Sequence, residues 1–127
     1  MIDDIDGLRR VLLDCRSIAV VGLSANWHRP SFFAAKYMQE RGYTIIPVNP
    51  AYDEILGQKC YPNLRDIPVP VDMVDVFRKP ADVPPLVDDA LAIGARVFWM
   101  QLGVINEDAA RQAEAGGMQV VMDRCVK

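Results

Sequence analysis

Apolar residues follow two spacings along the chain, and each spacing predicts one kind of element. Over residues 2–15 apolar side chains recur at intervals of three and four, which predicts an amphipathic helix. Short runs rich in β-branched residues predict buried strands over 17–22, 43–48, 72–77, 95–101 and 118–122, with a further short strand around 59–61. Helical stretches over 31–41, 83–93 and 107–115 separate these strands.

Residues at the helix ends support these bounds. Gly42 and Gly94 stand where a helix favours a left-handed C-terminal residue. Asp82 and Asn106 are the expected N-caps of the helices 83–93 and 107–115. Pro30 suits the first turn of the 31–41 helix, with Ser31 as an alternative N-cap.

Strands that alternate with helices predict a parallel sheet covered on both faces. Because such crossovers are right-handed, we expect an α/β fold with a Rossmann-like doubly wound parallel sheet, in three α/β/α layers. The sheet should have five to six strands in the order 3-2-1-4-5-6. The chain has no repeat or linker, so residues 1–127 are expected to form a single domain.

Composition narrows the class of protein. A net charge of −3 gives no general attraction to nucleic acid or to an acidic membrane, so an anionic ligand needs a local site. The acidic N-terminus does not resemble a signal peptide, and no apolar stretch is long enough to span a bilayer. Cys15, Cys60, Cys125 and one histidine do not suggest a disulfide framework or a zinc site. We therefore expect a cytoplasmic protein with reduced thiols, of which Cys125 is the one to test for reactivity.

Polar residues follow several strands at the carboxyl edge of the predicted sheet, where ligands bind doubly wound folds. These segments are Gly22, Leu23, Ser24; Val48, Asn49, Pro50; Phe77, Arg78, Lys79, Pro80; and Met100, Gln101, Leu102, Gly103. The start of the 31–41 helix offers unpaired N–H groups and a partial positive charge, which attract an anion. Ser24, Asn26, Arg29 and Ser31 add donors, and the Arg29 guanidinium can clamp a diphosphate.

The kind of nucleotide follows from what this edge lacks. A dinucleotide site needs G-x-G-x-x-G and a carboxylate after the second strand, whereas here Gly22 precedes Leu23 and Ser24, and the second strand is followed by Asn49. These departures disfavour NAD, and no Walker loop occurs. An adenine nucleotide with an extra phosphate on its ribose would suit the absence of that carboxylate.

Several of these residues have a second interpretation. Arg29 can be a solvated loop residue and Ser31 a plain N-cap, while Arg78 and Lys79 either complete the anion site or are ordinary surface charges. Gln101 and Gly103 can let a narrow chain pass close to the backbone, although Gly103 is equally a turn glycine. His28 is expected to pack or hydrogen-bond near the ligand, and Trp27 to act as a lid or packing residue.

The segments "AVVGLSANWHRPSFFAAKYMQERGYTIIPVNP", "DMVDVFRKP", "WMQLGV" and "DRC" together resemble the small single-domain CoA-binding protein family. That family is similar to the CoA-binding domain of the succinyl-CoA synthetase α subunit. The resemblance implies that coenzyme A binds with Gly22, Leu23, Ser24, Arg29, Pro30 and Ser31 around its phosphates. It places Val48, Asn49 and Pro50 near the adenosine, and Phe77, Arg78, Lys79, Gln101 and Gly103 at the next positions along the edge.

The resemblance does not extend to ligase chemistry. The synthetase uses a phosphorylated histidine in a second domain and a partner subunit, and His28 does not match that position. The leading hypothesis is a module without catalysis of its own that binds coenzyme A or an acyl-CoA. The alternatives are a regulatory domain that senses NAD(P), and a CoA-thioester enzyme that uses His28 or Cys125. We expect a small-molecule ligand, no nucleic acid and no membrane, with a homo-oligomer or a protein partner left open.

Overall fold

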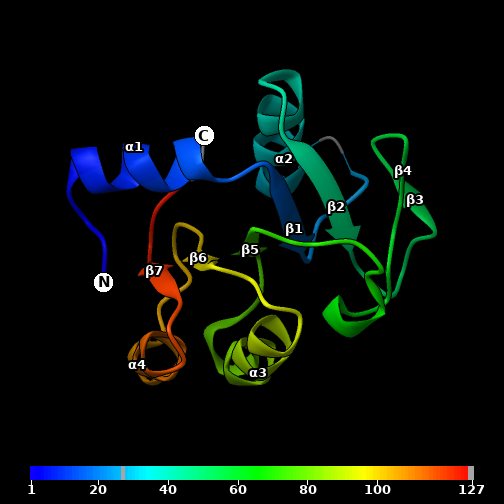
Figure 1. The fold of residues 1–127 in the computed structure, drawn as a ribbon. Coiled ribbons are helices and arrows are strands. Elements are labelled where there is room, and N and C mark those ends of the chain that lie inside the picture. Colours follow the sequence, from blue (N-terminus) through cyan, green and yellow to red (C-terminus); the bar gives the residue numbers. More distant parts are fainter. Residues whose placement is uncertain (27, 126–127) are drawn as a thin grey trace.

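The computed structural model describes residues 1–26 and 28–125, which form a parallel sheet with helices on both faces (Figure 1). Its five strands lie in the order β2-β1-β5-β6-β7. They are β1 (Ser17–Val21), β2 (Thr44–Val48), β5 (Met73–Val76), β6 (Val97–Met100) and β7 (Gln119–Val121). A small antiparallel hairpin of β3 (Glu54–Ile55) and β4 (Gln58–Lys59) packs beside β2.

Two helices cover each face of the sheet (Figure 1). On one face lie α1 (Ile5–Asp14) and α2 (Pro30–Glu40), and on the other α3 (Pro84–Ala92) and α4 (Glu107–Ala115). Short 3₁₀ helices η1 (Leu64–Asp66) and η2 (Pro80–Asp82) connect these layers. The predicted Rossmann-like, doubly wound α/β/α fold is confirmed.

The sheet separates two apolar cores because successive side chains of a strand point to opposite faces. On β1, Ile18 and Val20 pack with α1 and α2, whereas Ala19 and Val21 pack with α3 and α4. Trp99 on β6 is 1% exposed and belongs to the core beneath α1 and α2. The strands are buried on both faces, which explains their nearly continuous apolar sequence.

The outer edge of β2 explains why the described residues add no sixth strand to the sheet. Tyr61 makes a single parallel bridge there, donating its N–H to the Pro47 carbonyl at 3.0 Å and accepting from the Asn49 N–H at 2.9 Å. Val48 bonds to β1, so the neighbouring Pro47 faces outward, where it has no N–H to offer a further strand. The expected order 3-2-1-4-5-6 therefore lacks strand 3, and the remaining order 2-1-4-5-6 corresponds to β2-β1-β5-β6-β7.

The helix caps agree with the sequence in one case and differ in another. Asn106 caps α4 as predicted, because its Oδ1 accepts the Ala109 N–H at 3.0 Å. The prediction that Asp82 caps the preceding helix, α3, is wrong. Residues Pro80–Asp82 form η2, which places Val83 at the N-cap of α3 with no side-chain cap bond.

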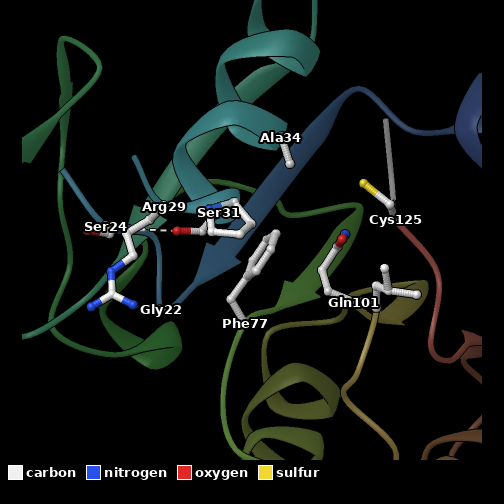
Figure 2. Close-up of a pocket in the computed structure, with 10 residues that line it drawn as sticks. Gly22, Ser24, Arg29, Ser31, Ala34, Phe77, Gln101 and Cys125 are labelled. Atoms are coloured by element: carbon white, nitrogen blue, oxygen red, sulfur yellow. Dashed lines mark hydrogen bonds between the residues drawn. The ribbon is translucent and has the colours of Figure 1, made fainter. Parts of the chain in front are cut away.

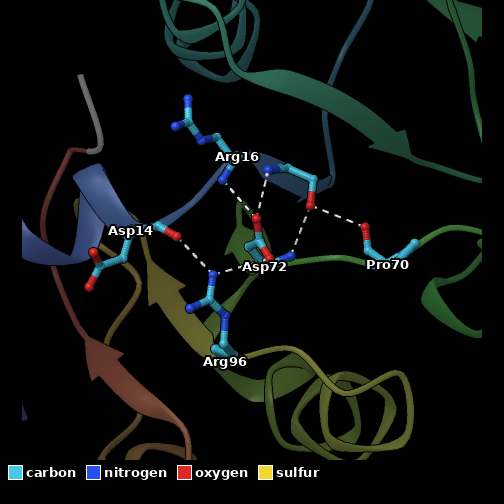
Figure 3. Close-up of polar contacts among 6 residues, drawn as sticks. Asp14, Arg16, Pro70, Asp72 and Arg96 are labelled. Atoms are coloured by element: carbon cyan, nitrogen blue, oxygen red, sulfur yellow. Dashed lines mark hydrogen bonds and ion pairs between the residues drawn. The ribbon is translucent and has the colours of Figure 1, made fainter.

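Asp72 fastens the amino ends of the strands, at the edge of the sheet opposite their carboxyl ends (Figure 3). Its Oδ2 accepts the backbone N–H groups of Arg16 at 2.7 Å and Ser17 at 3.2 Å, and its Oδ1 lies 3.2 Å from the Arg96 guanidinium. Arg96 also donates to the Asp14 carbonyl at 2.8 Å. Burial raises the pKa of Asp72, but these hydrogen bonds and the Arg96 charge outweigh it and lower the pKa overall.

Candidate functional site

A pocket of about 530 Å³ opens at the carboxyl edge of the sheet, between β1, β5, β6 and the start of α2 (Figure 2). The strand order reverses between β1 and β5, which is where doubly wound folds bind ligands. The pocket is lined by Gly22, Ser24, Arg29, Pro30, Ser31, Ala34, Phe77, Gln101, Leu102 and Cys125. Seven of the predicted site residues are thus brought together: Gly22, Ser24, Arg29, Pro30, Ser31, Phe77 and Gln101.

Gly22 lets the ends of β1 and β5 approach each other. Its φ is +86°, a conformation that strains any residue with a Cβ. A Cβ at this position would also lie 2.2 Å from the Phe77 carbonyl oxygen. The absence of a side chain therefore fixes one wall of the pocket.

A series of local hydrogen bonds shapes the loop between β1 and α2. The Ser31 hydroxyl accepts the Ser24 N–H at 3.1 Å, the Ser24 hydroxyl accepts the Asn26 N–H at 3.0 Å, and Asn26 Oδ1 accepts the His28 N–H at 2.9 Å. Ser31 is 5% exposed and does not cap α2, whose N-cap is Arg29 without a side-chain cap bond. The interpretation of Ser31 as a plain N-cap is wrong, because its hydroxyl holds the loop instead.

Positive charge gathers where α2 begins. The Arg29 side chain is exposed, lines the pocket, and makes no hydrogen bond or ion pair within the described part of the chain. The first turn of α2 offers fewer free donors than expected. Pro30 has no N–H, and the N–H groups of Phe32 and Phe33 contact the Arg29 carbonyl at 3.1 and 3.3 Å. Among the described atoms the Ser31 N–H has no acceptor, so it joins the Arg29 guanidinium as a donor available to an anion.

The opposite end of the pocket is more apolar and holds one buried polar pair. Ala34, Phe77 and Leu102 line it, together with Gln101, a residue that is 2% exposed. Gln101 Nε2 donates to Asp75 Oδ1 at 2.6 Å. Burial raises the pKa of Asp75 to about 7, although the hydrogen bond from Gln101 lowers it.

Cys125 closes this end of the pocket (Figure 2). The chain before it is held against β6, because Trp99 Nε1 donates to the Arg124 carbonyl at 2.8 Å and the Arg124 N–H to the Met100 carbonyl at 3.3 Å. The Cys125 thiol is exposed, whereas Cys15 and Cys60 are buried, and all three are free. Burial raises the pKa of Cys15 to about 11 and also raises that of Cys60.

Three lining residues were not among the predicted site residues, although Leu102 belongs to the strand-end segment 100–103. Ala34 lies one turn into α2, on the face that packs against the sheet, and Leu102 follows Gln101 directly. Cys125 follows β7, whose carboxyl end lies at the same edge as the others. Applying the strand-end rule to the last strand would have placed Cys125 at the site.

The remaining predicted site residues lie outside the pocket lining. Leu23 and Val48 are buried in the cores. Asn49 donates its amide to the Leu23 carbonyl at 3.1 Å, which joins the β1 and β2 ends. The residues Pro50, Arg78, Lys79 and Gly103 are exposed at the same edge, and the Gly103 N–H donates to Asp123 Oδ1 at 2.7 Å.

The described residues offer neither a metal-binding cluster nor a membrane-spanning helix. None of them form a group of three histidine, cysteine, aspartate or glutamate side chains suited to a metal ion. The described helices are all too short or too polar to cross a membrane. Trp27, expected as a lid or packing residue, lies outside the described residues.

Fold and site together define a Rossmann-like domain with a ligand pocket at the reversal of its strand order. Residues 16–127 match the family model described as "CoA binding domain", and the chain belongs to that family. The family resemblance inferred from the sequence is confirmed.

Three similar proteins place the chain more closely. It is 42% identical to YneT of Bacillus subtilis (strain 168), an uncharacterized protein, over 94% of this chain and 89% of YneT. It is 40% identical to the ADP-forming acetate–CoA ligase II of Archaeoglobus fulgidus over 78% of this chain, but over only 15% of that ligase. The solved structure of a hypothetical protein from Pyrococcus horikoshii OT3 superposes with a TM-score of 0.92 at 38% identity, covering 99% of this chain and 92% of that one.

Proposed function

We propose that the pocket binds coenzyme A or an acyl-CoA, with its diphosphate at the start of α2, and that the chain performs no catalysis of its own. The observation that carries the proposal is the Arg29 guanidinium, which has no partner among the described residues and stands at the mouth of the pocket beside the α2 N-terminus. A guanidinium binds two phosphate oxygens at once, and the helix dipole also favours a negative charge at the N-terminus of α2.

The two ends of the pocket match the two ends of coenzyme A. Arg29 and Cys125 lie at opposite ends (Figure 2). The phosphates would meet Arg29 and the Ser31 N–H, and the narrow pantetheine chain would run past Gly22 and Phe77 towards Gln101. The adenosine would lie outside the pocket near Asn49 and Pro50, with the exposed charges of Arg78 and Lys79 close to its ribose phosphate.

Membership of the CoA-binding domain family and the similarity to a CoA ligase support this ligand. They do not support ligase activity here, because the similarity to the archaeal enzyme covers 15% of its length. A cytoplasmic location stays a prediction.

Calorimetric titration with coenzyme A tests the proposal. The Arg29→Ala variant should bind about ten to a hundred times more weakly, since a hydrogen bond to a charged group contributes roughly 1.5–3 kcal/mol. Arg9→Ala is the matched control: it removes the same charge from an exposed position on α1 outside the pocket lining, and should bind as the unaltered protein does. Absence of binding to the unaltered protein would rule out the proposal. Displacement of coenzyme A by NADPH at lower concentration would instead favour the NAD(P)-sensing alternative.

A further inference from the structure

An ionisable side chain lies buried in the middle of the sheet, directly behind the pocket. Asp75 is 1% exposed and lies on β5, in register with Val20 of β1 and Trp99 of β6. Its carboxylate makes one hydrogen bond within the described residues, the 2.6 Å contact from Gln101 Nε2. Burying a carboxylate with so few partners is costly, so apolar packing does not explain the choice of residue.

The surroundings of Asp75 carry no compensating charge. Its neighbours on the sheet are apolar, and the α2 residues packed on this face are Ala34, Ala35 and Met38. The titratable side chains in the core on this face are Cys15, Cys60 and Tyr43, and Arg29 and Cys125 line the adjoining pocket. None of these charges contributes to the pKa of Asp75, which burial raises to about 7 against the hydrogen bond from Gln101.

The contact with Asp75 sets which end of the Gln101 amide faces the ligand. An ionised carboxylate has only acceptors, so it must take the NH₂ group of the amide. The Gln101 side chain also lines the pocket, and Figure 2 shows its amide end directed into it between Phe77 and Cys125. Within the described structure no donor reaches Gln101 Oε1, so this oxygen is an acceptor presented to the pocket.

We propose that Asp75 is a positioning residue that holds the Gln101 amide so that its Oε1 accepts an amide N–H of the pantetheine chain. This inference rests on the proposed function, because coenzyme A brings two secondary amides linked by methylene groups. The amide N–H would find its acceptor in Gln101, and the methylene groups would contact Ala34, Phe77 and Leu102. A protonated Asp75 would instead donate its O–H to Oε1, and the rotated amide would present its NH₂ group to the ligand.

Affinity for coenzyme A should therefore depend on the protonation of Asp75. Binding of a ligand that donates N–H favours the ionised carboxylate, so affinity is greatest above a pH of about 7 and falls as Asp75 takes up a proton. The amide introduced by Asp75→Asn does not titrate, and it can pair with Gln101 at every pH. Protonation of the ligand phosphates affects binding to the variant and to the unaltered protein equally. It therefore cancels in the ratio of their two dissociation constants at each pH.

The experiment is calorimetry with coenzyme A from pH 6 to 8.5 on the unaltered protein and Asp75→Asn. Between pH 8.5 and pH 6 the unaltered protein should lose about three to ten times more affinity than the variant, the scale of one hydrogen bond. Parallel profiles would overturn the inference, since a merely structural Asp75 predicts no such difference.

A second variant keeps the test decisive if Asp75→Asn does not fold. Gln101→Met keeps the length of the side chain and removes the acceptor. It should weaken coenzyme A about three- to tenfold at pH 8.5, and leave the affinity for adenosine 3′-phosphate 5′-diphosphate, which lacks pantetheine, unchanged. Equal affinity of Gln101→Met and the unaltered protein for coenzyme A would refute the role of Gln101. If the unaltered protein binds neither ligand, the proposed function itself has failed.

Discussion

Replacing Gly22 with alanine tests whether the close approach of β1 and β5 builds the pocket. At a φ of +86° a residue with a Cβ costs about 1–2 kcal/mol. The new Cβ would also lie 2.2 Å from the Phe77 carbonyl oxygen. Because that obstacle is main chain, the strand ends must separate, and overpacking of this kind costs roughly 1–3 kcal/mol. The free energy of unfolding should therefore fall by about 2–5 kcal/mol.

Gly103 provides a matched control at the same edge of the sheet. Its φ is +85°, and an alanine Cβ there would meet no described atom within 4 Å. Gly103→Ala should thus lower the free energy of unfolding only by the cost of the left-handed backbone, about 1–2 kcal/mol. The difference between the two variants isolates the contact between Gly22 and Phe77.

Urea unfolding followed by tryptophan fluorescence measures both variants, with the slope m checked for a change in the unfolded state. Under the proposed function, Gly22→Ala should also bind coenzyme A more weakly than Gly103→Ala, since the displaced Phe77 lines the pocket. Equal losses of stability in the two variants would show that the close approach does not constrain the fold.

Three further predictions concern stability and thiol chemistry. Because the pKa of Asp72 is lowered in the folded protein, its carboxylate stabilises the fold above its unfolded pKa, and this stabilisation is lost as the pH falls. Asp72→Asn should therefore lower the free energy of unfolding by about 1–2 kcal/mol at pH 7. In urea titrations at acid pH, the variant should approach the stability of the unaltered protein. Asn106→Ala should lower the free energy of unfolding in urea by about 1–2 kcal/mol, because it removes both the α4 cap and a 2.8 Å bond to the Pro80 carbonyl. A similar loss in Asp82→Ala would contradict the absence of a side-chain cap bond on α3. Iodoacetamide followed by peptide mass spectrometry should label exposed Cys125 before Cys15, whose pKa burial raises to about 11, and saturating coenzyme A should slow that labelling if the pocket binds it.

The sequence was enough to predict the layers of the fold and the edge that carries the pocket. Strand and helix spacings are local properties, and the rule for doubly wound sheets then places every strand end at one edge. Gly22, Arg29 and Gln101 were found in this way. The rule does not say which residues of a strand end face inward, so Arg78 and Lys79 were grouped with Gln101 although they lie outside the pocket lining.

The two aspartates around β5 show what the sequence could not distinguish. Asp72 and Asp75 stand three residues apart in "DMVDVF", but one binds backbone N–H groups at the edge and the other is buried against Gln101. Their roles depend on the neighbouring strands, which meet only in the folded chain. Likewise, the helix after β5 was expected to begin at an Asp82 cap, because the 3₁₀ turn that displaces this cap has no distinctive pattern.

Pro47 also limits how copies of this protein can associate. A growing intermolecular sheet needs each added strand to find alternating donors and acceptors along an open border. On this side the proline withholds one donor and Tyr61 already occupies the adjoining main-chain groups. Fibril-like stacking through β2 is thereby discouraged, and a dimer, if one forms, would join through another surface.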